Sequence, residues 1–364
     1  MTCVLAGIGT AVPSHRISQA DAAELTKSFC CFTDQQERLL PVLYRRTGVE
    51  SRHSVLLGPA NGSVAGRQSF YQPARDEFDR GPKTSKRMAR YEHEVAPLAI
   101  RAAQKALQES RLPPSRVTHL ITVSCSGFGA PGFDIKLMKA LCLPSDLART
   151  HIGFMGCHAA LNGLRVAKSF IESDPDACVL LCAVELCSLH QQYGWNPEQI
   201  VANSLFADGA AAVVCVDESN NDTSNWRVAA SGAHIVPDSE EAMSWRIGDH
   251  GFEMTLSARV PDLIRQELRP WLEGWLKANS FSISQVSAWA IHPGGPRILG
   301  ACADAAGLDP SLLAASRQTL ATYGNMSSPT VLFILERIRS QNVHVPCVAL
   351  GFGPGLAVEA TLFT

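Results

Sequence analysis

Short apolar runs alternate along this chain with longer stretches of helical periodicity. The clearest runs, such as Cys178–Val184, are apolar at every position, which is typical of strands buried on both faces. Strands of this kind need helices on either side, so the sequence predicts an α/β protein of layered sheets and helices. We predict strands at Cys3–Ile8, His119–Ser124, Cys178–Val184, Ala211–Val216, Arg227–His234, Ser287–Ile291, Cys347–Gly351 and Leu356–Phe363. We predict helices at Arg87–Ser110, Ala159–Ser173, Ala258–Ala278 and Ser328–Gln341.

A polar, turn-rich stretch at Asp217–Trp226 separates two halves, which we place at residues 1–220 and 221–364. The halves share a plan, because each has a long helix, then a strand, then a loop that carries a motif. An internal structural duplication is therefore expected. A second stretch, Leu56–Gly81, is rich in Gly, Pro and polar residues and is predicted to be a surface loop.

The composition favours a large packed core and argues against several classes of partner. Of 364 residues, 46% are hydrophobic, and the net charge is -2, so nucleic acid and anionic membranes are not expected partners. No run approaches the length of a membrane span, and the N-terminus is interpreted as a first strand rather than a signal peptide. We therefore expect a cytoplasmic protein. The basic cluster Lys83, Lys86, Arg87 and Arg90 is expected to be a solvated helix face, with an anionic small molecule as the alternative.

The chain contains 12 cysteines, most of them inside apolar runs. Buried thiols behave as small hydrophobic side chains, and a reducing compartment disfavours disulfides. Cys178, Cys182 and Cys187 do not follow a CxxC pattern, so no metal site is expected.

Cys157 lies in a glycine-flanked turn directly before a helical stretch, in the motif GFMGCHAALNG. A cysteine at the N-terminal end of a helix has a lowered pKa, because the helix dipole favours the thiolate. Small neighbours, such as Gly156 and Ala160, leave room for a substrate. The alternative is that Cys157 is a buried structural cysteine. Two further motifs in the sequence make this alternative less favoured.

Those motifs place polar side chains next to buried elements. His292 follows the predicted strand Ser287–Ile291 in HPGGP, where a satisfied histidine at a strand end is the alternative. Asn325 precedes an apolar helix in YGNMSSP, where Ser327 or Ser328 could cap that helix instead. An amide donor beside an imidazole donor suits a thioester oxygen that becomes an enolate or oxyanion.

The motifs GCHAALNGLRVAKSF, LFADGAAAVV, HPGGP, YGNMSS and GFGPGL resemble the type III polyketide synthases, the family that includes chalcone synthase. The resemblance spans nearly the whole chain. It implies the thiolase fold, with two similar halves in a five-layered αβαβα arrangement, and a homodimer with the Phe128–Phe133 loop near the partner's active site. It places the catalytic triad on Cys157, His292 and Asn325, and a gatekeeping phenylalanine on Phe206.

The resemblance also implies the chemistry. An acyl thioester starter would be transferred to Cys157, and malonyl-CoA would then lose carbon dioxide and attack it, in several rounds followed by cyclisation. Acyl-CoA and malonyl-CoA are the expected substrates, and no metal, flavin or nicotinamide cofactor is expected. Cys157 and His292 are expected to rest as an ion pair. The glycine-rich segment Gly351–Leu356 does not follow the pattern of a nucleotide loop and is predicted to be a turn near the active site.

The resemblance assigns a set of pocket positions beside the triad. Small side chains at Cys125, Cys187 and Ala202 favour a tunnel for a medium or long alkyl tail, whereas Trp245 could close the cavity. The pocket positions are Phe206, Cys125, Ser126, Cys187, His190, Ala202, Trp245, Met254 and Ser327.

Several alternatives stay open. The reaction could be a single condensation, as in the ketoacyl synthase III enzymes, or the starter could be malonyl or aromatic. A scaffold without catalysis is the contrasting class. The donor could be coenzyme A or an acyl carrier protein, and the basic residues that would hold it could be Arg45 and Arg46 or the cluster Lys83–Arg90.

Overall fold

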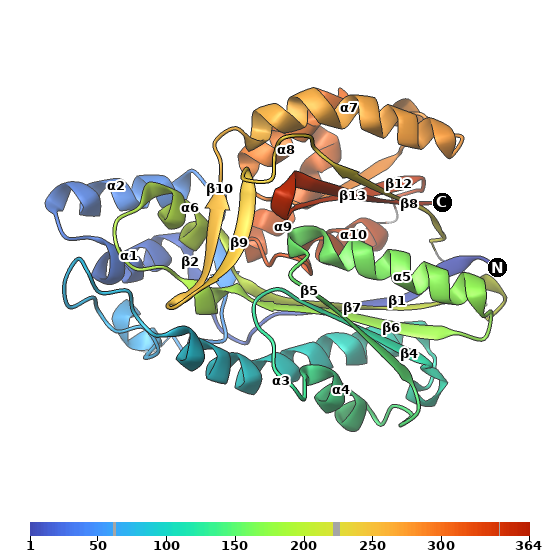
Figure 1. Cartoon of the computed structure of the whole chain (residues 1–364), viewed down its shortest axis with the longest axis horizontal. Coiled ribbons are helices and arrows are strands. Elements are labelled where there is room, and N and C mark those ends of the chain that lie inside the picture. The colour runs from blue at the N-terminus through green and yellow to red at the C-terminus, as the bar shows by residue number, and fades with distance from the viewer. Residues whose placement is uncertain (61–62, 221–225, 342) are drawn as a thin grey trace.

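The computed structural model describes residues 1–60, 63–220, 226–341 and 343–364. Its layers follow the order helix, sheet, helix, sheet, helix (Figure 1). This is the αβαβα arrangement of the thiolase fold, so the predicted fold class is confirmed. Residues 221–225 of the predicted joint lie outside the described residues.

The first sheet has the strand order β1-β7-β6-β4-β5. β7 pairs antiparallel with both β1 and β6, whereas β6, β4 and β5 run parallel. The helices α3 (Thr84–Ser110) and α4 (Phe133–Leu141) cover its outer face. The strands are β1 (Cys3–Ala11), β4 (His119–Ser124), β5 (Ala148–Gly153), β6 (Cys178–Leu186) and β7 (Asp208–Asp217).

The second sheet has the strand order β11-β12-β13-β8. β13 pairs antiparallel with β8 and β12, and β12 runs parallel to β11. The helices α7 (Val260–Ala278) and α8 (Pro296–Ala306) cover its outer face. The strands are β8 (Val228–Ile235), β11 (Ala288–Ile291), β12 (Cys347–Gly353) and β13 (Ala357–Phe363).

The two sheets repeat one strand plan. From the antiparallel edge, β1-β7-β6-β4 matches β8-β13-β12-β11 both in order and in strand direction. The central layer follows the same repeat, because α5 (Ala159–Ser173) comes from the first half and α10 (Thr330–Ser340) from the second. The expected duplication is therefore present in the topology.

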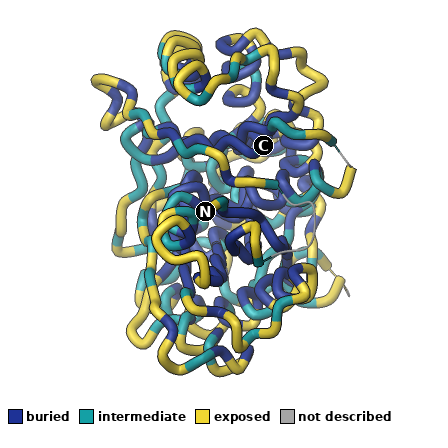
Figure 2. Tube along the Cα trace, turned by 90° about the vertical axis from the view of Figure 1, so that its right-hand side faces the viewer, coloured by how far each residue is buried: buried dark blue, intermediate teal, exposed yellow. Residues whose placement is uncertain are grey.

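Strand β6 shows why the runs are apolar at every position. Val179 and Leu181 pack towards the central helices, whereas Leu180 and Cys182 pack towards α3, because successive strand side chains point to opposite faces. All four are fully buried. Each large apolar side chain buried in this way contributes roughly 1.5–3 kcal/mol, and Figure 2 shows such buried segments running through the interior of the molecule.

Each predicted strand and helix overlaps an element of the structure, but several elements around the site were not predicted. The segment Leu56–Gly81 is irregular where it is described, apart from a short 3-10 turn at Val64–Arg67. No helix in the described ranges is both long enough and apolar enough to cross a membrane. The further elements are α1 (Gln19–Cys30), α2 (Asp34–Arg45), α6 (Pro197–Leu205), α9 (Ala314–Tyr323) and the short strands β2 (Arg16–Ser18), β3 (Ser51–His53), β9 (Met243–Gly248) and β10 (Gly251–Leu256).

The prediction of a solvated basic face on α3 is wrong for Arg87. Its side chain is fully buried, and its guanidinium donates hydrogen bonds to the carbonyl oxygens of Leu189 and Gln191 and to Tyr71 Oη. Arg87 therefore braces the turn after β6, whereas the two lysines of the cluster are exposed.

Candidate active site

Three residues from distant parts of the chain line one cavity. Cys157 lies in the turn before α5, His292 directly follows β11, and Asn325 precedes α10. All three are buried, and they line a cavity of about 420 Å³ that we call the entrance cavity. The fold therefore brings together the three residues predicted to form the triad.

The turn that carries Cys157 depends on close contact between the two halves. Gly156 has a positive φ of 76°, and a Cβ there would lie 2.3 Å from Cδ of Pro354. Only glycine fits both the conformation and the contact. The predicted turn at Gly351–Leu356 is confirmed for Pro354–Leu356, which lie against the predicted nucleophile, whereas Gly351–Gly353 form the end of β12.

Burial dominates the electrostatics of Cys157 and His292. It raises the pKa of Cys157 to about 12, with hydrogen bonding from Ser327 as the largest opposing effect. It lowers the pKa of His292 to about 3, and the nearby His158 lowers it further. Both shifts favour the neutral forms, so burial opposes the ion pair predicted from the sequence.

His292 and Asn325 present hydrogen-bond donors to the cavity. Neither ring nitrogen of His292 has a hydrogen-bond partner within the described residues. Asn325 Oδ1 accepts a hydrogen bond from the backbone N–H of Ser327 at 2.7 Å, which leaves its amide N–H groups to face Cys157. An imidazole and an amide placed in this way can hold an oxygen that gains negative charge.

The alternative role for the serines of YGNMSSP, capping α10, is wrong. The N-cap of α10 is Pro329, and no side chain caps the helix. Ser328 Oγ instead donates to the carboxylate of Glu185 at 2.7 Å.

Two smaller cavities adjoin the entrance cavity. The inner chamber, about 20 Å³, has room for about one water molecule and is lined by Cys125, Ser126, Cys157, Glu185 and Ser327 among others. The side cavity, about 80 Å³, extends towards α1 and is lined by Ala22, Leu25, Leu57, His190 and Ala202 among others. Phe206 and Met254 border both of these cavities and the entrance cavity, so they lie where the three meet.

The structure places every predicted pocket residue at one or more of these cavities. Cys187 and Trp245 line both the inner chamber and the side cavity, whereas Ala202 lines the side and entrance cavities. Phe206 also forms a parallel bridge with Asn325, which fixes its position beside the triad.

Three of these residues have structural tasks that the sequence did not reveal. Cys125 Sγ accepts a hydrogen bond from the backbone N–H of Gly156 at 3.1 Å, which supports the Cys157 turn. Trp245 Nε1 donates to the carbonyl oxygen of Cys125 at 2.8 Å, so its indole is held as a wall. His190 bonds through both ring nitrogens, to the backbone of Ser126 and Phe252, so it braces the pocket.

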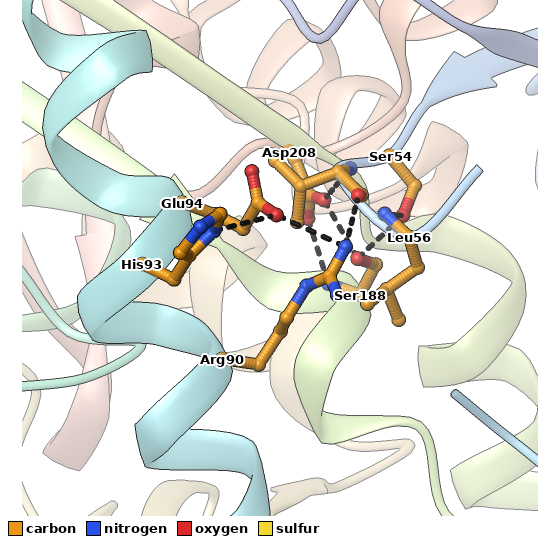
Figure 3. A network of polar contacts seen from close by, with 8 residues as sticks. Ser54, Leu56, Arg90, His93, Glu94, Ser188 and Asp208 are labelled. Atoms are coloured by element: carbon orange, nitrogen blue, oxygen red, sulfur yellow. Dashed lines mark hydrogen bonds and ion pairs between the residues drawn. The ribbon is translucent and has the colours of Figure 1, made fainter. Parts of the chain in front are cut away.

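A hydrogen-bonded network fixes one wall of the side cavity (Figure 3). Asp208 accepts hydrogen bonds from the backbone N–H groups of Val55 and Ser188, both at 2.8 Å, and from Ser188 Oγ at 2.6 Å. Ser54 Oγ donates to Ser188 Oγ at 2.7 Å. Because these polar groups bond one another, the wall presents mainly apolar atoms to the cavity.

Sequence reasoning missed several buried carboxyl groups, of which Glu185 lines the inner chamber beside Cys157. Glu185 interrupts the apolar strand CVLLCAVEL, and a charged residue in such a run is a signal that could have identified it. It accepts hydrogen bonds from the backbone of Cys125 and Ser126 and from Ser126 Oγ. Burial raises the pKa of Glu185 to about 7.

Two arginines line the entrance cavity, and the sequence analysis did not assign either of them a definite role. Arg46, after α2, was one of the alternatives for holding the donor, and Arg297, at the start of α8, was not considered. Both are exposed, and both line the cavity that leads to Cys157. All twelve cysteines lie in the described residues and are free thiols, and those residues contain no group of three or more His, Cys, Asp or Glu side chains placed to hold a metal ion.

Comparisons with known proteins identify the family. The family model described as chalcone and stilbene synthases, N-terminal domain, matches residues 1–218, and its C-terminal counterpart matches residues 227–364. The chain is 32% identical to 1,3,6,8-tetrahydroxynaphthalene synthase from Streptomyces peucetius subsp. caesius, over 98% of this chain and 92% of that protein. It is 29% identical to the alpha-pyrone synthesis polyketide synthase-like Pks18 from Mycobacterium tuberculosis, over 99% of this chain and 90% of that protein.

A solved structure gives the same answer. The crystal structure of PKS-I from the brown alga Ectocarpus siliculosus matches with a TM-score of 0.93 and 28% identity, over 100% of this chain and 98% of that chain. The chain therefore belongs to the chalcone and stilbene synthase family and is a type III polyketide synthase, an enzyme of the acyltransferase type.

Proposed function

We propose that this enzyme condenses malonyl-CoA repeatedly onto a medium or long fatty acyl starter and cyclises the product to an alkylresorcinol, an alkylpyrone or a related polyketide. The observation that carries the starter class is the side cavity, which adjoins the entrance cavity at Ala202, Phe206 and Met254 and is lined mainly by apolar atoms.

In the first step the starter is transferred to Cys157. His292, which is neutral and free of other hydrogen bonds, accepts the thiol proton as the sulfur attacks the thioester carbonyl. The coenzyme A thiol leaves with a proton, and the acyl chain remains on Cys157. The dipole of α5 favours the thiolate that forms during this attack.

In the second step malonyl-CoA binds with its thioester oxygen between His292 and Asn325. Loss of carbon dioxide leaves an enolate, whose charge these two donors stabilise. The carbanion attacks the acyl group on Cys157, and transfer of the lengthened chain back to Cys157 permits another round. Phe206 keeps water from the enolate. Release of the malonyl carboxylate as carbon dioxide drives the step, so this chemistry needs no metal, flavin or nicotinamide.

An alkyl tail suits the side cavity better than an aromatic ring does. The polar groups around this cavity bond to one another, as Asn203 and Gln192 do, so they offer few partners to a phenol. Each methylene of an alkyl tail that is buried there contributes about 0.8 kcal/mol. Met254, at the junction of the cavities, is flexible enough to let the tail pass.

The donor is proposed to enter through the entrance cavity. Arg46 and Arg297 are suited to bind phosphate groups of coenzyme A, because a guanidinium forms paired hydrogen bonds with phosphate. An acyl carrier protein would present one such phosphate, so carrier-bound donors are the alternative to test.

One observation favours the second candidate function, a single condensation. The inner chamber has room for only about one water molecule, so a growing ketide chain needs Trp245 or Met254 to move. Products with a single added ketide unit would support the single-round alternative.

We also propose a homodimer. The outer edge of β5 has no strand partner among the described residues, and most of its side chains point to solvent. Edge strands of this kind are normally paired or protected. Phe128, half-exposed beside β5, contacts Phe252 in the wall of the side cavity, so a partner bound there would adjoin the pocket. Light scattering should give twice 39.2 kDa, and a mass of one chain at micromolar concentration would exclude this assembly.

The test of the proposed reaction is mass spectrometry of products. The enzyme would receive malonyl-CoA alone or with fatty acyl-CoA starters of increasing length, and with coumaroyl-CoA as the aromatic control. We expect several ketide additions and the highest kcat/KM with a medium or long fatty acyl starter. A preference for coumaroyl-CoA or for malonyl-CoA alone over every fatty acyl starter would contradict the proposed starter class.

A further inference from the structure

His158 directly follows Cys157, and the reaction proposed above leaves it without a task. Its side chain is 1% exposed, and it lies at the start of α5 without capping the helix. Its ring is wedged against β12, because a Cβ at Gly353 would lie 2.5 Å from His158 Nε2. A buried imidazole beside the predicted nucleophile therefore spans the contact between the two halves.

A chain of hydrogen bonds fixes this imidazole. His158 Nδ1 lies 2.7 Å from Asn162 Oδ1, and Asn162 Nδ2 donates to Glu359 Oε1 at 2.8 Å. Glu359 Oε2 accepts a hydrogen bond from Arg165 at 3.1 Å. Glu359 is in β13, so the chain joins the helix that begins at the nucleophile to a strand of the other half.

The chain also determines the tautomer of His158. Because the amide nitrogen of Asn162 donates to Glu359, its oxygen must accept, and Nδ1 of His158 must carry the hydrogen. Burial lowers the pKa of His158, so the ring is neutral. The polar groups that act on it are His292, Asn162 and the ion pair of Glu359 with Arg165.

We propose that His158 is a positioning residue, which uses its hydrogen bond to Asn162 to hold the Cys157 turn so that Sγ faces His292. A ring fixed at Nδ1 cannot rotate, and the main chain of the turn is fixed with it. Without that hydrogen bond the turn gains alternative conformations in which Sγ is misplaced for proton transfer. The proposal rests on the proposed pairing of Cys157 with His292.

Two substitutions of His158 separate this role from simple packing. His158→Phe keeps a ring of similar shape but removes the donor. His158→Asn removes the ring but keeps an N–H donor near the position of Nδ1. If His158 acts through its hydrogen bond, His158→Asn should keep Cys157 more reactive than His158→Phe does. If His158 acts only by packing, His158→Phe should keep Cys157 more reactive.

The experiment measures alkylation of Cys157 by iodoacetamide at pH 7, followed by peptide mass spectrometry. Cys142, which is exposed, provides an internal control in the same protein. We expect His158→Phe to slow alkylation of Cys157 about tenfold, a size typical of residues coupled in one hydrogen-bonded network, and His158→Asn to restore most of the rate. Because iodoacetamide reacts with the thiol itself, failure of the proposed polyketide reaction leaves this test intact.

The same measurement in a His292→Ala background decides whether His158 acts through His292. There the difference between His158→Phe and the parent should vanish, whereas a purely structural defect would persist. If His158→Phe fails to fold, Asn162→Ala removes the acceptor of the same hydrogen bond. It should slow alkylation of Cys157 in the same way, and only when His292 is present. Wild-type alkylation in His158→Phe, or an equal loss with and without His292, would overturn the proposal.

Discussion

The two halves of this enzyme have the same strand plan but carry different side chains at corresponding positions. Cys125 directly follows β4, and His292 directly follows its counterpart β11. Cys157 precedes α5, and Asn325 precedes its counterpart α10. The residues at these two positions line adjoining cavities, because Cys157 borders both the inner chamber with Cys125 and the entrance cavity with His292 and Asn325. In the first half the two positions hold sulfur atoms, and in the second they hold an imidazole and an amide.

The difference shows how a duplicated fold divides one reaction. Cys125 supports the turn of Cys157 through a hydrogen bond, so both positions of the first half serve the proposed covalent step. His292 and Asn325 have donors directed at the cavity, so the second half serves the proposed stabilisation of negative charge. In the proposed reaction, neither half could carry out the condensation without the other.

The largest expected effect comes from removing the Cys157 thiol, the proposed nucleophile of the first half. Cys157→Ala should abolish acylation and chain extension, because Cys157 is the one thiol among the described residues that line the entrance cavity. The fold should persist, since alanine is only slightly smaller. Radiolabelled acyl-CoA measures the acylation, and Cys182→Ala, a buried thiol that lines none of the three cavities, is the matched control. Retained polyketide formation in Cys157→Ala would refute the assignment.

Removing the donors of the second half should separate the two steps. Asn325→Ala should accept the starter on Cys157 but lose about 10²–10³-fold in malonyl-CoA decarboxylation, the usual cost of one oxyanion donor. His292→Ala should damage both steps, because it also accepts the thiol proton. Single-turnover acylation and carbon dioxide release measure the steps separately. An Asn325→Ala enzyme that cannot be acylated would show that the division of labour is wrong.

We predict that the buried carboxyl group of Glu185, in the first half, makes the stability of the protein depend on pH. Burial raises the pKa of Glu185 to about 7, above its ordinary 4.5, so ionisation is disfavoured in the folded state. The contribution of Glu185 to the free energy of unfolding is therefore complete below pH 4.5 and is lost as the pH rises through about 7. Relative to Glu185→Gln, the wild type should lose up to roughly 3 kcal/mol over this range.

Denaturant unfolding at pH 5 and pH 8 measures this difference. The free energy of unfolding of the wild type should fall relative to Glu185→Gln as the pH rises. Glu240→Gln, which alters an exposed carboxyl, is the control. Parallel curves for wild type and Glu185→Gln would show that Glu185 ionises in its ordinary range.

The smallest expected effect concerns the starter. Ala202→Trp should fill the mouth of the side cavity and shorten the preferred acyl chain. Each methylene that can no longer be buried costs about 0.8 kcal/mol, or about fourfold in kcat/KM. Kinetics across acyl-CoA chain lengths measure the shift, with a two-carbon starter as the internal control. An unchanged preference for long chains would place the tail elsewhere.

The layered fold was predictable because burial on both faces leaves a direct mark on the sequence, as in β6. The grouping of Cys157, His292 and Asn325 at one cavity was predictable, because each lies in a motif through which the sequence resembles its family. Arg87 was not, because a basic residue on a helix is normally solvated, and only the carbonyl groups of distant residues reveal that it is buried. Ser328 was not, because its partner Glu185 is 143 residues away in the chain.

The central claim is that the first half holds the growing chain while the second half generates the nucleophile that extends it. Intact-protein mass spectrometry tests this most directly, with a fatty acyl-CoA added first and malonyl-CoA second. We expect the wild type to show the starter on Cys157 and then a ladder of added ketide units, and Asn325→Ala to show the starter alone. A starter adduct on another residue, or ketide units on Asn325→Ala at the wild-type rate, would contradict the account.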